Sequence, residues 1–268
     1  MDLQAAIAIR APDAPLALSA AHDAGSSGPG GGGPRRQRPL PLQPLDTGGG
    51  AARHSAVYDA LREALMDGRL APGTILTIRK VASSLGTSTM PVREALHRLA
   101  AHGALESLPN RSYRLILMSR ETWHQTLEIR LQLECLAVRR AAGMLSPGQL
   151  AQLDEITAEM AARPPPDPQR YLTLNRNFHF VIYEATGMPV LVELIGMIWL
   201  RVGPLLHACS SPYDIATANE CHATILKALR KGDGETAAAA LREDLLTANR
   251  VLLPGLNVSE PASGTEDR

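Results

Sequence analysis

Three polar side chains at the start of a predicted helix have the types and the spacing that suit contact with DNA. Ser88 and Thr89 stand at the helix start and Arg93 follows one turn later, on the side opposite the apolar residues. Short hydroxyls reach phosphates or base edges, and a guanidinium grips a guanine edge through two hydrogen bonds. The pattern is typical of a helix that enters the major groove, but a packed helical hairpin of any function has the same periodicity.

Two short helices joined by a glycine turn would position these side chains. Residues 78–85 carry an apolar stripe behind Thr77, the predicted N-cap, and Gly86 makes the turn. Pro91 falls in the first turn of the second helix, where its missing N–H has no intrahelical acceptor to lose. The buried side of that second helix is formed by Val92, Ala95, Leu96 and Leu99.

A first helix and a β-hairpin are predicted on either side of the helix pair. The first helix spans residues 55–67 and ends at Gly68. The hairpin pairs residues 104–108 with residues 113–117 around a polar turn. Arg111 stands at the tip of this turn, from which a guanidinium can enter a minor groove or hold a phosphate.

The stretch from residue 55 to residue 118 resembles the N-terminal winged helix of the GntR family of bacterial transcription factors. The residues that carry the resemblance are Gly68, Pro72-Gly73, Leu85-Gly86, Ser88, the run Pro91-Val92-Arg93-Glu94-Ala95-Leu96, Leu99 and Gly103. The resemblance implies that double-stranded operator DNA is a partner and that Arg79 and Arg93 contact it. Thr89 stands where many relatives have another arginine, and Ser112 where they often have glycine. Operator preference and the shape of the hairpin tip are therefore expected to differ from theirs.

The charge is divided unevenly between two parts of the 268-residue chain. The formal net charge is zero, yet residues 53–118 hold nine Lys and Arg against five Asp and Glu, and residues 119–268 hold fourteen against eighteen. A basic module joined to an acidic one is typical of a DNA-binding domain with a separate sensor. The three cysteines form no CxxC pair, which favours reduced thiols in the cytoplasm. No export signal or membrane span is predicted, because the apolar run at residues 190–200 is too short and contains Glu193.

Both ends of the chain are predicted to be disordered. Residues 1–52 hold nine of the 22 glycines and seven of the 20 prolines and show no sustained apolar period. The basic run at residues 35–38 within this extension either contacts DNA phosphates or is simply solvated. Residues 254–268 form the second disordered segment. The predicted domains are thus residues 53–118 and residues 119–253.

Residues 119–253 are predicted to form an all-helical domain, so the fold class is mainly α. Apolar positions recur at helical spacing, and proline or glycine separates the segments. A bundle of six or seven helices is the expected packing. The helices are predicted at residues 121–144, 147–160, 169–185, 190–207 with a kink or split near Gly203-Pro204, 214–231 and 235–252.

This second half resembles the FCD ligand-binding domain of the FadR branch of GntR regulators, over about residues 121–251. The residues that carry the resemblance are Arg130 with Leu133-Glu134, the run Asn175-Arg176-Asn177-Phe178-His179, the run from Cys221 to Leu229, and Gly232-Asp233. Many members bind a divalent metal through an acidic residue, the histidine four residues later and two further histidines. The resemblance thus implies a metal site in this chain at Asn175, His179, His222 and Asp244.

The implied ligand set departs from the family pattern at two positions. Asn175 replaces the acidic residue, and Asp244 replaces the last histidine. Two imidazoles, a carboxylate and an amide oxygen still suit zinc, nickel or manganese, with water or an effector carboxylate completing the shell. The alternative is that His179 and His222 are hydrogen-bonded core histidines and that Asp244 is a surface acid.

Arginines of the helical domain provide a second kind of candidate site. Arg130 either pairs with Glu134 one turn later or clamps an anionic effector, and Arg201 is the other candidate clamp. A guanidinium matches the two oxygens of a carboxylate, which points to a small organic acid as effector. Arg176 lies beside a ligand candidate but is predicted to point away from it.

These features together predict a cytoplasmic, homodimeric transcriptional regulator without enzymatic activity. Repression at an operator, relieved by a small carboxylate-like metabolite bound in the helical domain, is the expected mechanism. Two alternatives from other classes stay open: a metal-dependent hydrolase, which would leave the winged helix unexplained, and a DNA-binding dimer without a ligand. Thermal-shift measurements with a panel of organic acids, with and without EDTA, distinguish the three.

Overall fold

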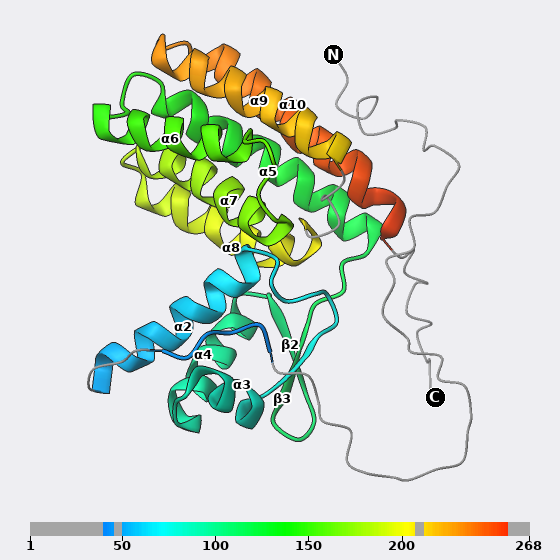
Figure 1. The fold of residues 1–268 in the computed structure, drawn as a ribbon. Helices are drawn as coiled ribbons and strands as arrows, with labels where there is room; N and C mark the ends of the chain where they lie inside the picture. Colours follow the sequence, from blue (N-terminus) through cyan, green and yellow to red (C-terminus); the bar gives the residue numbers. More distant parts are fainter. Residues whose placement is uncertain (1–39, 46–49, 207–211, 257–268) are drawn as a thin grey trace.

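The computed structural model describes residues 40–45, 50–206 and 212–256, which form a small winged helix joined to a larger helical bundle (Figure 1). The winged helix lies in the lower part of the figure and the bundle in the upper part, and α2 runs between them. The predicted fold class, mainly α with a winged helix followed by a helical bundle, is confirmed.

The described part of the winged helix contains three helices and a three-stranded sheet. The strand order is β1-β3-β2, and both pairs are antiparallel. The hairpin register places Leu105 opposite Leu115 and Leu108 opposite Ser112. The elements are α2 (Gly50–Met66), β1 (Ile75–Thr77), α3 (Ile78–Leu85), α4 (Thr89–Ala101), β2 (Leu105–Leu108) and β3 (Ser112–Leu115). Strand β1 was not predicted, because three residues are too few to show an alternating pattern.

The two helices of the predicted pair have the ends that their sequence indicates. The Thr77 hydroxyl accepts a hydrogen bond of 3.3 Å from the Lys80 amide and so caps α3. Gly86 ends the helix with a φ of 64°, a left-handed conformation in which a side chain would be strained. The apolar side chains that the periodicity selects are all buried: Ile78, Val81, Ala82, Leu85, Val92, Ala95, Leu96 and Leu99.

Six long helices form the described part of the bundle. Side chains cap the N-termini of four of them: Ser119, Ser146, Asp167 and Asp233 accept hydrogen bonds from backbone amides three residues later. Helix α10 packs against α9 and α5, and α8 lies on the side of the bundle that faces α2 (Figure 1). The elements are α5 (Arg120–Ala141), α6 (Pro147–Met160), α7 (Pro168–Glu184), α8 (Pro189–Leu206), α9 (Pro212–Arg230), α10 (Gly234–Leu252) and the 3₁₀ turn η1 (Leu253–Gly255).

The prediction near Pro204 was a kink or a split, and the split is wrong because helix α8 continues through this residue. Pro204 lies in the last turn of the described helix, where the loss of one backbone hydrogen bond is offset by burial of Val202, Leu205 and Leu206. By length and composition this helix is apolar enough to cross a membrane, but 56% of it is buried inside the structure. Such burial is what a core helix of a bundle requires.

Residues 40–45 differ from the predicted disordered extension, which runs to residue 52. Leu40 and Leu42 are buried, and the Leu45 amide donates a hydrogen bond of 3.0 Å to the Leu85 carbonyl at the end of α3. Leucines two residues apart suit an extended segment, a pattern that a search for helical periodicity misses. Helix α2 also begins five residues earlier than predicted, at Gly50.

The predicted disordered tail also begins too early. The first part of it lies in η1, and Leu256 is buried with its carbonyl accepting a hydrogen bond of 3.1 Å from Arg120 Nε. Residues 1–39, including the basic run at residues 35–38, and residues 257–268 lie outside the described residues.

Candidate functional site

The predicted DNA-contacting side chains are all exposed on the winged helix. Ser88 and Thr89 stand at the start of α4, Arg93 follows one turn later, and Arg79 lies at the start of α3. The Ser88 hydroxyl makes no capping hydrogen bond. Among the described residues, no hydrogen bond or ion pair engages the guanidinium groups of Arg79, Arg93 and Arg111. These groups are therefore free to bind phosphates or base edges.

The hairpin tip holds Arg111 in an uncommon backbone conformation. Asn110 and Arg111 have φ values of 62° and 57°, in the left-handed region that costs a residue with a side chain about 1–2 kcal/mol. The Ser112 hydroxyl closes the turn by donating to the Pro109 carbonyl (2.8 Å). Ser112 itself is the first residue of β3, so both left-handed positions of this tip lie before the strand begins.

Two imidazoles and a carboxylate converge inside the bundle. His179 comes from α7, His222 from α9 and Asp244 from α10, and all three are buried. His179 Nε2 lies 3.5 Å from one carboxylate oxygen of Asp244, and His222 Nε2 lies 3.6 Å from the other. One ligand atom from each residue falls within 4.8 Å of the others. The structure thus brings three of the four predicted metal ligands together.

The distances in this cluster fit a metal ion better than direct hydrogen bonds. Contacts of 3.5 and 3.6 Å are too long for strong N–H···O bonds. Ligand atoms that share one tetrahedral ion at about 2.0–2.1 Å lie roughly 3.3 Å apart. Both ring nitrogens of His222 are also buried without a hydrogen-bond partner, which costs free energy unless a ligand engages one of them. The donor set of two imidazoles and one carboxylate suits zinc, nickel or manganese.

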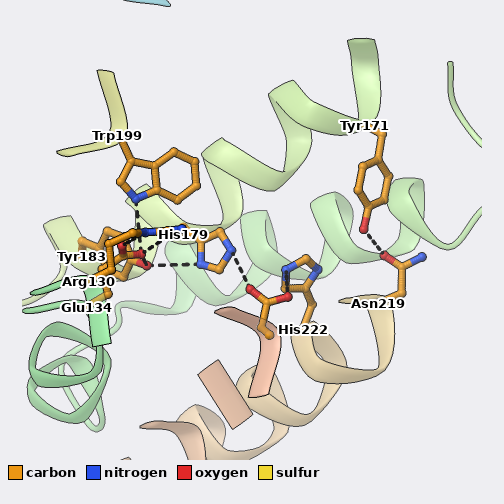
Figure 2. A network of polar contacts seen from close by, with 9 residues as sticks. Arg130, Glu134, Tyr171, His179, Tyr183, Trp199, Asn219 and His222 are labelled. Atoms are coloured by element: carbon orange, nitrogen blue, oxygen red, sulfur yellow. Dashed lines mark hydrogen bonds and ion pairs between the residues drawn. The ribbon is translucent and has the colours of Figure 1, made fainter. Parts of the chain in front are cut away.

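A chain of hydrogen bonds orients His179 (Figure 2). The Tyr183 hydroxyl donates to Glu134 Oε2 at 2.6 Å, so its oxygen accepts from His179 Nδ1 at 3.3 Å. This arrangement places the imidazole proton on Nδ1 and leaves the lone pair of Nε2 directed at the cluster with Asp244. A metal-binding histidine is held in this way by a partner on its other nitrogen.

Burial and charge act in opposite directions on the cluster. Burial lowers the pKa of His222 to about 4, and His179 contributes to the lowering while Asp244 opposes it. Burial would raise the pKa of Asp244, but the two imidazoles and Arg130 together lower it below its ordinary value. At neutral pH the cluster therefore offers a carboxylate and a neutral His222, the protonation states in which both groups bind metals.

Of the two alternatives for Arg130, the structure shows the pairing with Glu134, and the role as a clamp for an anionic effector stays a prediction. Its Nε donates to Glu134 Oε1 at 2.6 Å, and this ion pair is buried. Its Nη1, in contrast, is buried without a partner, and Arg130 lines a cavity of about 50 Å³ together with Asn175, His179 and Asp244. An unsatisfied guanidinium nitrogen beside the cluster suits an anionic group such as a carboxylate.

The remaining predicted site residues divide into two groups. Asn175 lines the cavity one turn before His179 on the same helix. Arg201 is not among the residues that line this cavity, and its Nε is buried without a hydrogen-bond partner. Arg176 points away from the cavity, as predicted, and pairs with Asp67 at 2.9 Å.

Sequence reasoning missed the residues that support the site. Tyr183 lies one turn after His179 on the same helix, so its spacing could have identified it. Trp199 donates from its indole Nε1 to Glu134 at 3.2 Å, and its ring lies 5.5 Å from the Arg130 guanidinium carbon. Nothing local in the sequence places α8 against α5, so this contact could not be predicted.

The fold defines a class of protein: a transcriptional regulator with a DNA-binding winged helix and a separate helical bundle. Residues 53–115 match the family described as "Bacterial regulatory proteins, gntR family", and residues 125–247 match the FCD domain. The chain belongs to the GntR family and carries an FCD domain as its C-terminal half.

Individual relatives agree with this assignment. The HTH-type transcriptional regulator McbR of Escherichia coli K12 is 33% identical over 191 residues, which cover 70% of this chain and 86% of McbR. The HTH-type transcriptional repressor RspR of the same organism is 26% identical over 70% of this chain and 84% of RspR. The solved structure of E. coli McbR/YncC superposes with a TM-score of 0.69 and covers 75% of this chain and 96% of that one.

Proposed function

We propose that this regulator is a cytoplasmic homodimer that represses an operator and is controlled by a divalent metal and a small organic acid in the bundle cavity. The repressor role is supported by relatives that carry this name, such as RspR. The operator is bound by the winged-helix residues that the sequence predicts as DNA contacts: Arg79, Ser88, Thr89, Arg93 and Arg111. The acid is expected to weaken operator binding.

The observation that carries the proposal is a set of buried, unsatisfied polar atoms in the cluster of His179, His222 and Asp244 and in the cavity beside it. Both ring nitrogens of His222 and Nη1 of Arg130 are buried without hydrogen-bond partners. His179, His222 and Asp244 would hold the metal, and Asn175 lies close enough along α7 to provide a weaker, neutral ligand. The metal supplies positive charge at the cavity, and Arg130 supplies a second cationic group for a carboxylate.

Elemental analysis of untagged protein tests the metal. We expect about one zinc, nickel or manganese ion per chain in the wild type, and a metal-dependent rise in melting temperature, because the ion binds only the folded state. The double variant His179→Ala, His222→Ala should lose both effects. The double variant His97→Ala, His124→Ala removes two histidines outside the cluster and should keep them. Sub-stoichiometric metal in every variant, with no stabilisation by added ions, would show that His179 and His222 are ordinary core residues.

A panel of organic acids tests the effector. In the presence of metal, at least one small carboxylate should raise the melting temperature of the wild type and lower its affinity for DNA that the protein itself selects from a random-sequence pool. EDTA should abolish the effect of that acid, whereas Arg130→Gln should weaken it with the metal still bound. Stabilisation by carboxylates that is equal with and without EDTA would separate the effector from the metal and contradict the proposed site.

A further inference from the structure

Helix α7 contacts two different parts of the molecule through two different sides. Tyr171, Asn175 and His179, spaced by four residues, lie along the side that lines the bundle cavity. Gln169 and Arg176 lie on another side and reach the segment that follows α2. One helix therefore carries both a predicted metal ligand and a contact to the DNA-binding domain.

The second side of α7 holds Asp67, the first residue after α2. Gln169 Nε2 donates to the Asp67 carbonyl at 2.9 Å, and Arg176 Nη1 lies 2.9 Å from the Asp67 carboxylate. The Thr173 hydroxyl, between these two on the same side of α7, also contacts this carboxylate. Asp67 is 4% exposed, so these contacts connect the two domains in a desolvated environment.

The charge and burial of Asp67 suit a contact between α7 and the end of α2 that can shift. Burial raises the pKa of the Asp67 carboxyl above its ordinary value, although Arg176 and Arg69 oppose this effect. The attraction of the two arginines thus offsets only part of the cost of burying the Asp67 carboxylate. Such a pair adds little net stability, but it determines where the end of α2 lies relative to α7.

Helix α2 extends this contact to the recognition helix. At its C-terminal end, the backbone of Leu65 and Met66 packs closely against Gly203 of α8. Further along, the Tyr58 hydroxyl lies 3.2 Å from His102 Nδ1, immediately after α4, and the Arg98 guanidinium of α4 lies 4.0 Å from the centre of the Tyr58 ring. A displacement of the end of α2 is therefore transmitted to α4.

We propose that Asp67 and Arg176 are positioning residues that couple the bundle cavity to the orientation of the winged helix. Metal bound at His179 restrains α7, and Arg176 on the same helix then changes the position of the end of α2 and of the recognition helix beyond it. This inference rests on the proposed function, because it takes the metal in the cavity as the signal.

The test measures whether zinc alone changes DNA affinity through this ion pair. Full-length chain is stripped with EDTA, zinc affinity is measured by calorimetry, and affinity for a selected DNA fragment is measured with and without zinc. In the wild type, zinc should change DNA affinity roughly five-fold or more, the usual lower range of coupling between two sites. Arg176→Gln should bind zinc as the wild type does and lose most of this change.

A matched control and a second variant make the result specific. Arg170 lies on the same helix and forms an exposed ion pair with Glu159 at 2.6 Å, so Arg170→Gln removes an equivalent interaction that does not reach α2. This variant should keep the full zinc effect. Asp67→Asn keeps the shape of the side chain, should reproduce Arg176→Gln, and serves if Arg176→Gln folds poorly. The double variant Asp67→Asn, Arg176→Gln should lose no more of the zinc-dependent change in DNA affinity than either single variant, because both substitutions remove the same contact.

The outcomes separate this inference from the proposed function. If wild-type protein binds no zinc, the proposed metal site is wrong and the inference is overturned with it. If the wild type binds zinc without any change in DNA affinity, or if Arg176→Gln and Asp67→Asn retain the full change, the metal site stands and the coupling role of the ion pair is wrong. Arg176→Lys, which retains the charge without the fork of donors, should restore part of the coupling.

Discussion

Arg93 is the side chain that most directly tests the DNA surface. It is exposed one turn into α4 and has no partner among the described residues, so its removal should leave the fold intact. If its guanidinium binds a guanine edge through two hydrogen bonds, Arg93→Ala should weaken operator binding by roughly 1–3 kcal/mol and relax the preference at that base pair. A mobility-shift assay measures the loss. Equal affinity of the two proteins would falsify this assignment.

Arg111 allows DNA binding and stability to be separated at one residue. Its left-handed backbone is unfavourable for a side chain but not for glycine. Arg111→Gly should therefore leave the melting temperature unchanged or raise it. The loss of the guanidinium should weaken DNA binding and make the slope of log affinity against log salt concentration shallower by about one, as expected for one lost phosphate contact. Calorimetry and binding at several salt concentrations check both effects. A lower melting temperature together with unaltered DNA affinity would contradict the role given to this tip.

At the scale of helices and strands, the sequence predicts the elements that have local signals and misses those that depend on packing. Helix α3 matches its prediction because Thr77 caps one end and Gly86 the other. The convergence of His179, His222 and Asp244 was predicted only through the resemblance, since no local pattern places α9 and α10 beside His179. The extended contact of residues 40–45 and the position of Trp199 next to Glu134 depend on which surfaces meet, and short-range periodicity carries no such information.

The close approach of α8 and α2 gives a prediction at this same scale. A methyl group at Gly203 would lie 2.4 Å from the Leu65 carbonyl oxygen and 2.7 Å from the Met66 Cα, and both are backbone atoms, so no side chain can rotate away to make room for it. Gly203→Ala should therefore destabilise the protein by roughly 1–3 kcal/mol. Gly148→Ala in α6 is the control, because a methyl group there meets no atom within 4 Å. Thermal denaturation compares the two variants. An equal melting temperature for both would contradict the close packing of α8 against α2 at Gly203.

For the whole molecule, the two-domain design predicts a dimer. One winged helix presents a single recognition helix and one hairpin tip, whereas two copies related by a two-fold axis match the two half-sites of a near-palindromic operator. Light scattering at micromolar concentration should therefore give twice the mass of one chain, with and without DNA. Arg93→Ala should give the same mass, because Arg93 is predicted to contact DNA and not the second chain. The mass of a single chain in both conditions would rule out the dimer. A dimer seen only with DNA would mean that two chains associate by binding the same operator and not through contacts of their own.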